Sequence, residues 1–359
     1  MPERVVVAMS GGVDSSVAAA LLKEQGYEVI GITMCFNLAD VTKKRLACCS
    51  LQGIEDARAV AHKLNLKHYV LNMQKILQQF VISDFCSEYI LGRTPNPCVR
   101  CNQYIKFDAL LKKALSLDAK FLATGHYARI AKTKEGYQLK KASDLFKDQS
   151  YFLYRLNQGQ LKHALFPLGN YTKNETRKLA KKLDLPVADK LASQEICFLP
   201  DSDYRIFLKS VVSGNIKPGN IVDKKGNILG QHKGIAFYTI GQREGLGIAK
   251  GYPLYVIEID QRQNQIVVGK KEDAYKNSFI IKEPHFILRP ITKKVELRVK
   301  IRYNHIAALA DVLPFDHKIK VQFRKPQFAI TPGQSAVFYD KDKVIGGGII
   351  EKPCESEYN

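Results

Sequence analysis

A short run of small and hydroxylated residues, VAMSGGVDSS at positions 7–16, has the composition of a phosphate-binding turn. The apolar, β-branched residues 4–8 predict a strand that is buried on both faces of a parallel sheet. Residues 17–22 predict a helix. Residues 10–12 would then lie at the amino end of that helix, where free backbone N–H groups and the helix dipole favour an anion. The sequence therefore predicts that this turn binds phosphate groups.

The turn does not match the two commonest phosphate-binding patterns. The P-loop requires Gly-Lys-Ser/Thr and the dinucleotide fingerprint requires Gly-x-Gly-x-x-Gly, and neither occurs in this chain. An ordinary strand-to-helix turn is the alternative, but the hydroxyl and carboxylate groups of Ser10, Asp14 and Ser15 favour phosphate binding. In that interpretation, hydroxyls and amides of the turn hold the phosphates, and Asp14 positions Mg²⁺ or the phosphates.

A second run, GRTPNPCVRCN, places Cys98 and Cys101 directly after two prolines that restrict the backbone. We expect Arg93 and Arg100 to lower the pKa of both thiols and so to increase the thiolate fraction. A single Cys-x-x-Cys pair is only half of a zinc site, and the sequence contains no second pair. Cys197, in the run QEICF, is the other candidate nucleophile. The residues alone leave open whether these cysteines are catalytic or are small buried apolar residues.

Composition bounds the class of protein. A chain of 359 residues, 45% of them hydrophobic, is long enough for two or three globular domains. Its 55 Lys and Arg against 35 Asp and Glu give a net charge of +20, which favours a polyanion such as nucleic acid, although a solvated basic surface is the alternative. No apolar run approaches the ~20 residues of a membrane span, and no signal-peptide-like run follows Met1, so we expect a cytoplasmic protein without a membrane partner. The eight scattered cysteines indicate chemistry or metal binding in a reducing compartment.

Up to about residue 200, predicted strands and helices alternate, which indicates a doubly wound α/β domain with a parallel sheet. We expect strands at 27–34, 68–73 and 120–125, and helices at 54–65, 74–91, 107–117 and 172–182. Ligands of such sheets bind at the carboxyl ends of the strands. Met34 and Gly125 lie at two of these ends, next to the turn at 10–12.

After about residue 202, turn pairs separate β-rich runs, which predicts two small β-rich domains. A short helix at 204–212 precedes strands at 235–240, 254–260 and 265–269. The last block resembles a β-barrel, with strands at 294–303, 318–323, 335–339 and 344–351. We therefore divide the chain into domains 1–203, 204–278 and 279–359.

Six motifs occur in order and together resemble the tRNA-specific 2-thiouridylase (MnmA or TrmU) family, in which the first α/β domain is a PP-loop ATP pyrophosphatase domain. They are SGGVDS at 10–15, TPNPCVRCN at 94–102, ATGHY at 123–127, KDQSY at 147–151, SQEICF at 193–198 and TIGQR at 239–243. The resemblance covers nearly the whole chain, including both β-rich domains.

The resemblance implies a transferase that uses ATP and Mg²⁺ to replace the C2 oxygen of the wobble uridine with sulfur in tRNAs for Lys, Glu and Gln. ATP adenylates the C2 oxygen, a persulfide on Cys197 supplies sulfur, and Cys101 releases it or closes a transient disulfide bond. The implied partners are the tRNA anticodon stem-loop and a sulfur-relay protein or cysteine desulfurase. The implied ATP-binding residues are Ala8, Met9, Ser10, Gly11, Gly12, Val13, Asp14, Ser15, Met34 and Gly125.

The resemblance also implies residues that contact tRNA, because the wobble base must be flipped out of the anticodon stack for modification. These residues are Asn96, Pro97, Cys98, His126, Lys147, Asp148, Gln149, Arg302, Tyr303 and Gln334.

One position departs from the family pattern, because many members carry Asp where this chain has Cys98. Cys98, Cys101 and Cys197 together could hold an iron–sulfur cluster whose open iron binds sulfide, which is an alternative sulfur source. A different class, an amide-forming ATP pyrophosphatase such as a GMP or NAD synthetase, would share only the first motif. We expect Cys48 and Cys49 to be structural or incidental.

Overall fold

The computed structural model describes residues 2–36, 51–191, 196–199, 203–212, 214 and 216–354. Cys48, Cys49 and residues 193–195 of the fifth motif, SQEICF, lie outside the described residues. The chain forms two compact units. The first comprises residues 1–81, 98–203 and 342–345, and the second comprises residues 82–97, 204–341 and 346–359.

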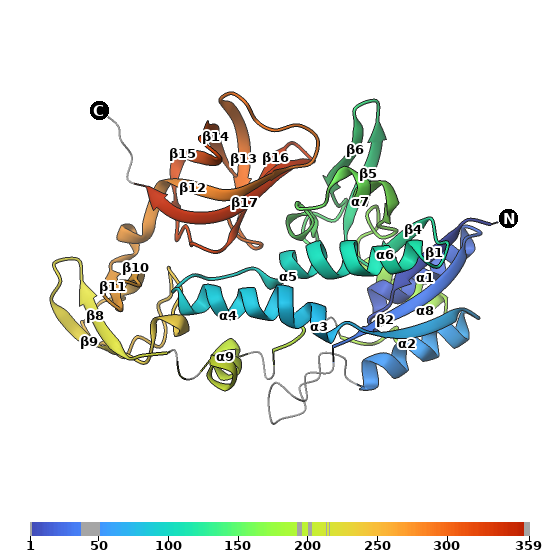
Figure 1. The fold of residues 1–359 in the computed structure, drawn as a ribbon, viewed down its shortest axis with the longest axis horizontal. Helices are drawn as coiled ribbons and strands as arrows, with labels where there is room; N and C mark the ends of the chain where they lie inside the picture. The colour runs from blue at the N-terminus through green and yellow to red at the C-terminus, as the bar shows by residue number, and fades with distance from the viewer. Residues whose placement is uncertain are drawn as a thin grey trace. The chain divides into compact units, whose positions relative to one another are not determined.

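The first unit is built on a parallel five-stranded sheet with the order β3-β2-β1-β4-β7 (Figure 1). The strands are β1 (Arg4–Ala8), β2 (Glu28–Cys35), β3 (Lys67–Asn72), β4 (Phe121–Thr124) and β7 (Ala164–Leu165). Val6 of β1 is in register with Ile30 of β2 and with Leu122 of β4. The sheet confirms the doubly wound prediction, and the predicted strands at 27–34, 68–73 and 120–125 are all present.

Helices cover this sheet because its strands are apolar on both faces. Val5 and Val7 belong to one buried cluster, together with side chains of α1 (Val13–Glu24), α2 (Leu51–Lys63) and α8 (Lys173–Lys182). Figure 1 shows these three helices beside β1 and β2. Val6 points to the opposite face and is also fully buried. Each such valine contributes about 1.5–3 kcal/mol of burial free energy, which fixes β1 as the central strand.

Two long helices carry π-helical segments. The predicted helix at 74–91 is confirmed as α3 (Gln74–Leu77), η1 (Gln78–Ile82) and α4 (Ser83–Ile90). The helix predicted at 107–117 begins ten residues earlier, as α5 (Pro97–Arg100), η2 (Cys101–Leu110) and α6 (Leu111–Leu115). Proline fits the first turn of a helix, where its missing N–H has no intrahelical partner, so Pro97 can start the helix. The helix start therefore includes both cysteines of the second motif.

The sequence analysis missed a hairpin in the first unit, formed by β5 (Ala128–Thr133) and β6 (Gly136–Lys141). Short helices follow it, η3 (Ser150–Phe152) and α7 (Gln158–His163). The predicted capping box is present, because Thr172 and Glu175 exchange side-chain-to-backbone hydrogen bonds at the start of α8.

The second unit contains α9 (Tyr204–Val212), as predicted, and a four-stranded sheet with the order β10-β11-β8-β9. These strands are β8 (Gly219–Asp223), β9 (Ile228–His232), β10 (Tyr255–Asp260) and β11 (Gln265–Gly269). The strand predicted at 235–240 is wrong, because the chain forms a 3₁₀ turn, η6 (Ile235–Phe237). Gly234 before it has a φ of +138° and packs so closely on Ile216 that a Cβ would lie 2.1 Å from its Cγ2 atom. Residues 235–237 are therefore buried although they form a 3₁₀ turn and not a strand.

A closed six-stranded barrel completes this unit, as predicted (Figure 1). Its strands run in the order β12-β15-β14-β13-β16-β17, and pairing of β12 with β17 closes the ring. They are β12 (Tyr275–Phe286), β13 (Val295–Lys300), β14 (Ala308–Phe315), β15 (Lys318–Phe328), β16 (Ser335–Asp340) and β17 (Lys343–Cys354). Within the described residues, no helix has both the length and the apolar character needed to cross a membrane.

Substitution of Gly125, directly after β4, tests how closely the loop after β4 packs on α1. A Cβ at this position would lie 2.7 Å from the backbone nitrogen of Ser15 and 2.8 Å from the carbonyl carbon of Asp14. We expect Gly125→Ala to lower the free energy of unfolding by about 1–3 kcal/mol, because the start of α1 must shift. Urea unfolding measures this change. Gly230→Ala is the control, since its Cβ would meet only the Ile248 side chain, at 3.5 Å from Cγ1 and 4.0 Å from Cδ1. Equal losses in both variants would contradict the close packing.

Candidate functional site

The order of the sheet places the predicted phosphate turn in a crevice. β1 pairs with β2 on one side and with β4 on the other. The strand order therefore reverses at β1, because β2 and β3 extend the sheet on one side of it and β4 and β7 extend it on the other. Ligands of open α/β sheets bind outside the carboxyl ends of the strands at such a reversal. Residues 10–12 follow β1, and Gly125 follows β4 and packs on Asp14 and Ser15. The structure therefore brings these predicted residues together. Met34 is the penultimate residue of the neighbouring strand β2.

The turn is preorganised by its own serines. The Ser10 backbone N–H donates to Ser15 Oγ over 3.1 Å, and the Ser16 hydroxyl donates to the Gly12 carbonyl over 2.9 Å. Gly12 is the N-cap of α1, and no side chain caps the helix there. The first N–H groups of α1 are thus left for a ligand, which is the arrangement that binds anions.

Five residues of the predicted nucleotide site are buried, namely Ala8, Met9, Gly11, Val13 and Ser15. Gly11 has a φ of +70° and contacts Gly53 so closely that a Cβ would lie 2.2 Å from its carbonyl oxygen. Only glycine fits this position, because both the backbone conformation and the space exclude a side chain.

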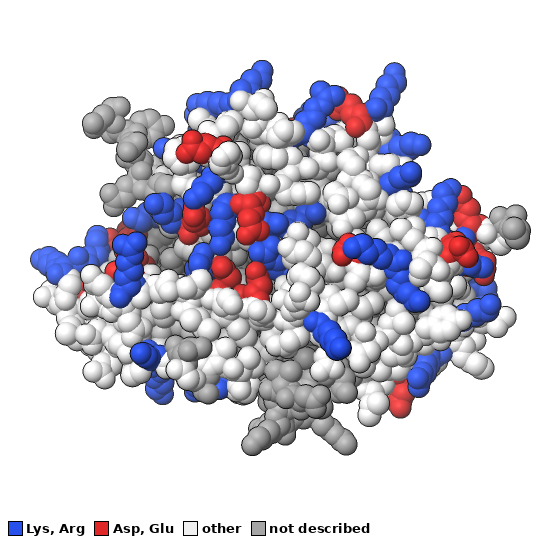
Figure 2. Space-filling view, viewed as in Figure 1, with Lys and Arg blue, Asp and Glu red and all other residues white. Residues whose placement is uncertain are grey.

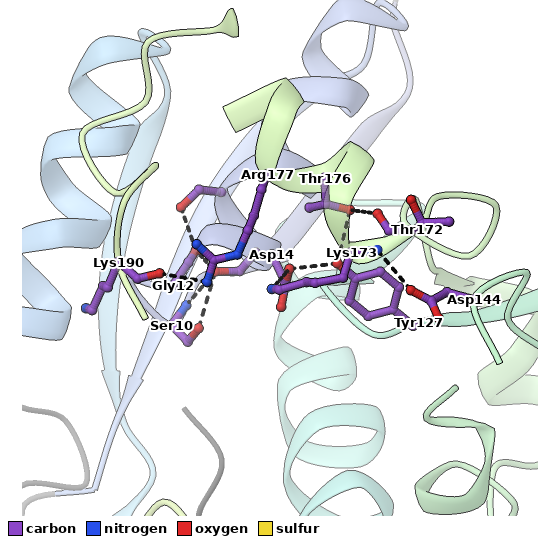
Figure 3. Close-up of polar contacts among 12 residues, drawn as sticks. Ser10, Gly12, Asp14, Tyr127, Asp144, Thr172, Lys173, Thr176, Arg177 and Lys190 are labelled. Atoms are coloured by element: carbon purple, nitrogen blue, oxygen red, sulfur yellow. Dashed lines mark hydrogen bonds and ion pairs between the residues drawn. The ribbon is translucent and has the colours of Figure 1, made fainter. Parts of the chain in front are cut away.

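Basic side chains from α8 and the segment after it converge on the turn (Figure 3). Lys173 Nζ lies 2.5 Å from Asp14 Oδ1, and Lys190 Nζ donates to the Gly11 carbonyl over 2.9 Å. Lys190 also pairs with Asp56 of α2 over 2.5 Å. Arg177 donates to the Lys190 carbonyl over 3.3 Å. The phosphate turn therefore has ammonium groups on two sides.

Asp14 is also held in place by the hydroxyl of Tyr127, which is itself bonded to Thr176. The Tyr127 hydroxyl donates to Asp14 Oδ1 over 2.9 Å and lies 3.0 Å from the Thr176 hydroxyl. Burial and the Asp14 carboxylate raise the pKa of Tyr127, so its hydroxyl stays protonated and can donate. Mg²⁺ is commonly bound by one or two carboxylates plus the phosphates of its nucleotide. Asp14 fits that donor set, because only its Oδ1 atom accepts hydrogen bonds from the described residues.

The second motif forms the start of the long helix. Cys98 and Cys101 are three residues apart in it, so both thiols lie on one helical face, with Cys98 exposed and Cys101 half-buried. Crowding by protein atoms raises the pKa of Cys98 to about 11, with a smaller contribution from Cys101, and burial also raises the pKa of Cys101. Lys106 opposes both increases. The expectation that Arg93 and Arg100 lower these pKa values is wrong: the cation near the thiols is Lys106, and Arg93 pairs with Glu88 over 3.6 Å.

His126 lies beside the same lysine. Lys106 Nζ is 3.4 Å from His126 Nε2, and Thr124 Oγ1 is 2.7 Å from His126 Nδ1. Since an ammonium only donates, Nε2 accepts and Nδ1 carries the proton. Burial and then the Lys106 charge hold the pKa of His126 well below its usual range. His126 is therefore a neutral hydrogen-bonding group at physiological pH.

Residues 147–149 are divided between surface and interior. Lys147 is exposed, whereas Asp148 is buried and accepts hydrogen bonds from Ala142 N and from the Ser150 hydroxyl at 3.0 and 2.9 Å. The Gln149 side chain accepts from the Tyr127 backbone N–H over 3.0 Å. The Asp148 carboxylate thus fixes the conformation of residues 142–150.

In the second unit, the barrel supports residues 94–97. Gln334 Nε2 donates to the carbonyls of Thr94 and Pro95 over 3.0 and 3.2 Å. A guanidinium nitrogen of Arg302 donates to the carbonyls of Ile240 and Ala329 over 3.0 and 2.7 Å. Gln334 and Arg302 therefore hold backbone segments, and next to Arg302 the Tyr303 ring lies 5.3 Å from Lys300 Nζ.

Cys98, Cys101 and Cys197 all belong to the first unit, and Cys98 and Cys197 are exposed. Across the described residues, no three His, Cys, Asp or Glu side chains come together as a possible metal site. These three cysteines therefore do not form the ligand set that an iron–sulfur cluster needs.

Comparison with protein families covers nearly the whole chain. A family described as a tRNA methyl transferase HUP domain matches residues 3–201, a tRNA methyl transferase PRC-barrel domain matches 205–270, and an aminomethyltransferase beta-barrel domain matches 276–350. The tRNA-specific 2-thiouridylase MnmA 1 of Caldanaerobacter subterraneus subsp. tengcongensis is 53% identical, over 97% of this chain and 98% of the relative. The chain belongs to the MnmA family of tRNA-specific 2-thiouridylases.

Other MnmA relatives match over a similar share of the chain. The enzyme of Clostridium acetobutylicum is 51% identical over 98% of this chain and 100% of the relative, and that of Halothermothrix orenii is 52% identical over 98% and 99%. Among solved structures, an NMN synthetase from Francisella tularensis aligns with 58% of this chain and 75% of its own, at 18% identity and a TM-score of 0.36. We draw no functional argument from that similarity.

Sequence reasoning missed four basic residues of the candidate site, namely Lys106, Lys173, Arg177 and Lys190. The capping box at 172–175 predicted the helix that carries Lys173, but nothing local in the sequence showed that its side chain reaches Asp14. Such contacts join residues 159 positions apart and come only from the fold.

Protonation of His126 should destabilise the folded state. The pKa of His126 is lowered on folding, so below about pH 6.5 the unfolded chain binds a proton that the folded chain does not. Stability is thus fully present above that pH and falls by up to about 1.4 kcal/mol per pH unit below it. We expect His126→Asn to reduce this acid-induced loss, measured by urea unfolding at about pH 7.5 and about pH 5.5. His62→Asn, at an exposed position, is the control, and identical pH dependence in both variants would contradict the assignment.

Lys106 should control the reactivity of Cys101. Because Lys106 lowers the thiol pKa, Lys106→Met should slow alkylation of Cys101 by iodoacetamide near neutral pH by about three- to tenfold. Peptide mass spectrometry follows the rate at Cys101 alone. Lys113→Met, an exposed residue of the same helix, should leave the rate unchanged, and an equal effect of both substitutions would show that general surface charge is responsible.

Proposed function

We propose that this chain catalyses the ATP-dependent 2-thiolation of the wobble uridine in tRNAs for Lys, Glu and Gln. One observation carries the proposal: the phosphate turn and the Cys98–Cys101 pair lie in the same compact unit of a chain that is 53% identical to a named 2-thiouridylase. An amide-forming ATP pyrophosphatase would use the turn but has no use for the thiols. That alternative is not favoured by the relatives' names.

The first step is adenylation of the uridine. The C2 oxygen attacks the α-phosphorus of ATP, the bond to the β-phosphate oxygen breaks, and pyrophosphate leaves. The N–H groups at the start of α1, together with Lys173 and Lys190, would stabilise the charge that develops on pyrophosphate. Asp14 would hold Mg²⁺ together with the phosphates, and the ion would neutralise phosphate charge. Met34 and Gly125 would border the adenosine.

The second step transfers sulfur. The terminal sulfur of a Cys197 persulfide attacks C2, the C2–O bond breaks, and AMP leaves with the oxygen. The Cys101 thiol then attacks the Cys197 sulfur, which forms a Cys101–Cys197 disulfide and releases the thiolated tRNA. A dithiol supplies two electrons to restore both thiols, and a sulfur-relay protein or cysteine desulfurase reloads Cys197. The exposure of Cys197 supports this reloading, because a protein donor must reach it.

Not every residue of the predicted tRNA site needs to contact RNA. We propose direct contacts for Asn96, Pro97, Cys98, His126, Lys147 and Tyr303. The other predicted residues would be positioning residues, because their side chains already bind backbone groups, namely Asp148, Gln149, Arg302 and Gln334. Neutral His126 suits hydrogen bonding to an uncharged base.

The charge of the chain supports an RNA substrate. In Figure 2, Lys and Arg side chains are spread over the visible face and many have an acidic neighbour. Basic charge is thus dispersed over this face, and a net charge of +20 suits a long phosphate backbone better than one small anion. We propose that domain 1–203 carries the chemistry and that domains 204–278 and 279–359 contribute tRNA binding.

The decisive experiment incubates anaerobically prepared protein with ATP, Mg²⁺, unmodified tRNA and a persulfide source, and analyses digested nucleosides by mass spectrometry. We expect a uridine that gains the mass difference between sulfur and oxygen, with AMP release that depends on tRNA. Cys101→Ser should abolish the thiolated nucleoside. Lys173→Met should slow AMP release about ten- to 1000-fold, because it removes charge from the leaving pyrophosphate.

Controls separate the alternatives. Cys86→Ala removes a buried thiol outside the proposed chemistry and should retain activity. AMP release without tRNA would indicate an amide-forming enzyme, and a uridine that gains the mass of a methylene group would indicate methyl transfer. Activity that is lost in iron-free protein despite a persulfide source would restore the iron–sulfur alternative.

A further inference from the structure

Two consecutive apolar side chains project into solvent between Ala142 and Lys147. Leu145 is 69% exposed and Phe146 is 97% exposed. Large apolar side chains are usually buried, and Phe146 is the most exposed among the large hydrophobic residues of the described chain. The groups around Leu145 and Phe146 therefore indicate what these exposed side chains could bind.

The exposed turn is held in a defined shape. The Asp144 carboxylate accepts from the Phe146 backbone N–H over 3.1 Å, and the Lys147 backbone N–H donates to the Asp144 carbonyl over 3.1 Å. The Ser143 N–H donates to the Gly169 carbonyl over 2.9 Å. The Phe146 ring is thus presented by a hydrogen-bonded turn.

The same turn is tied to the phosphate site. The second Asp144 oxygen accepts from the Lys173 backbone N–H over 3.0 Å, and the Lys173 ammonium pairs with Asp14 (Figure 3). At its other end, the turn leads to Gln149, whose side chain binds Tyr127, which in turn donates to Asp14. Lys173 therefore connects this turn to the phosphate site, because its backbone N–H binds Asp144 and its ammonium group pairs with Asp14.

The chemistry around Phe146 matches a single-stranded nucleotide. Lys147, the residue that follows Phe146 in the chain, is exposed, and Asp144, the only carboxylate between Ala142 and Lys147, is engaged by backbone N–H groups. An aromatic ring beside a lysine is the pairing with which proteins stack a base and hold its phosphate. Two apolar side chains are too small an area for a specific protein interface, which commonly needs about 800 Å² per partner.

We propose that Phe146 stacks on an unpaired tRNA nucleotide other than the modified uridine, with Leu145 flanking the base and Lys147 binding its phosphate. The inference rests on the proposed function in taking tRNA as the substrate. It adds a substrate-binding residue next to the 147–151 motif, at a position that the motif does not include.

The test measures binding of unmodified tRNA by fluorescence anisotropy, with no ATP or sulfur source present. Phe146→Ala should raise the Kd about five- to 100-fold, Phe146→Leu should lose most of the same affinity, and Phe146→Tyr should retain it, because stacking needs a ring. Phe315→Ala, which removes a 49% exposed phenylalanine from the end of β14, is the matched control and should bind normally. Melting curves should coincide for all four variants, since neither ring is in a core.

Two outcomes overturn the proposal. Equal Kd values for Phe146→Ala and the unsubstituted chain would exclude stacking on tRNA. Normal tRNA binding with slower sulfur transfer from a protein donor, but not from free persulfide, would assign Phe146 to the donor instead. Because binding is measured without turnover, a chain that binds tRNA through Phe146 but makes no thiouridine would disprove the proposed function and leave this inference standing.

Discussion

The pairing of β1 with β2 on one side and β4 on the other is the constraint on which the site depends. Both pairings are parallel, so the loops that follow β1 and β4 emerge at the same edge of the sheet. The absence of a Cβ at Gly125 lets these loops touch, which brings Tyr127 to Asp14. The valines of β1 are buried on both faces of the sheet, and their burial stabilises this arrangement.

The long helix that begins at Pro97 organises the sulfur chemistry in a similar way. It carries Cys98, Cys101 and Lys106 on one continuous element, and Lys106 acts on both thiols and on His126. The same ammonium favours a charged thiol and disfavours a charged imidazole. Burial acts against charge on all three groups, so the site holds a neutral histidine and thiols whose ionisation depends on one lysine.

The sequence predicted those parts of the molecule that depend on local pattern. The turn at 10–12, the capping box at 172–175 and the parallel sheet all follow from composition and periodicity in short windows. The helix start at Pro97 was missed because the Cys-rich run reads as a loop, and residues 235–237 were mistaken for a strand because apolar runs do not distinguish a strand from a buried turn. Lys173, Lys190 and Lys106 could not be assigned, since their partners lie far away in sequence or on a neighbouring element.

The pairing of Lys173 with Asp14 has a consequence for how the phosphate turn meets a nucleotide. Its only acidic side chain carries an internal counterion before any ligand arrives, and both partners are largely shielded from water, with 14% and 33% of the side chains exposed. The carboxylate is therefore already neutralised when an anion approaches, and it does not repel that anion. Under the proposed function, entry of a magnesium nucleotide would exchange one cation for another around a fixed carboxylate, so ionic strength and free magnesium would act on the same equilibrium.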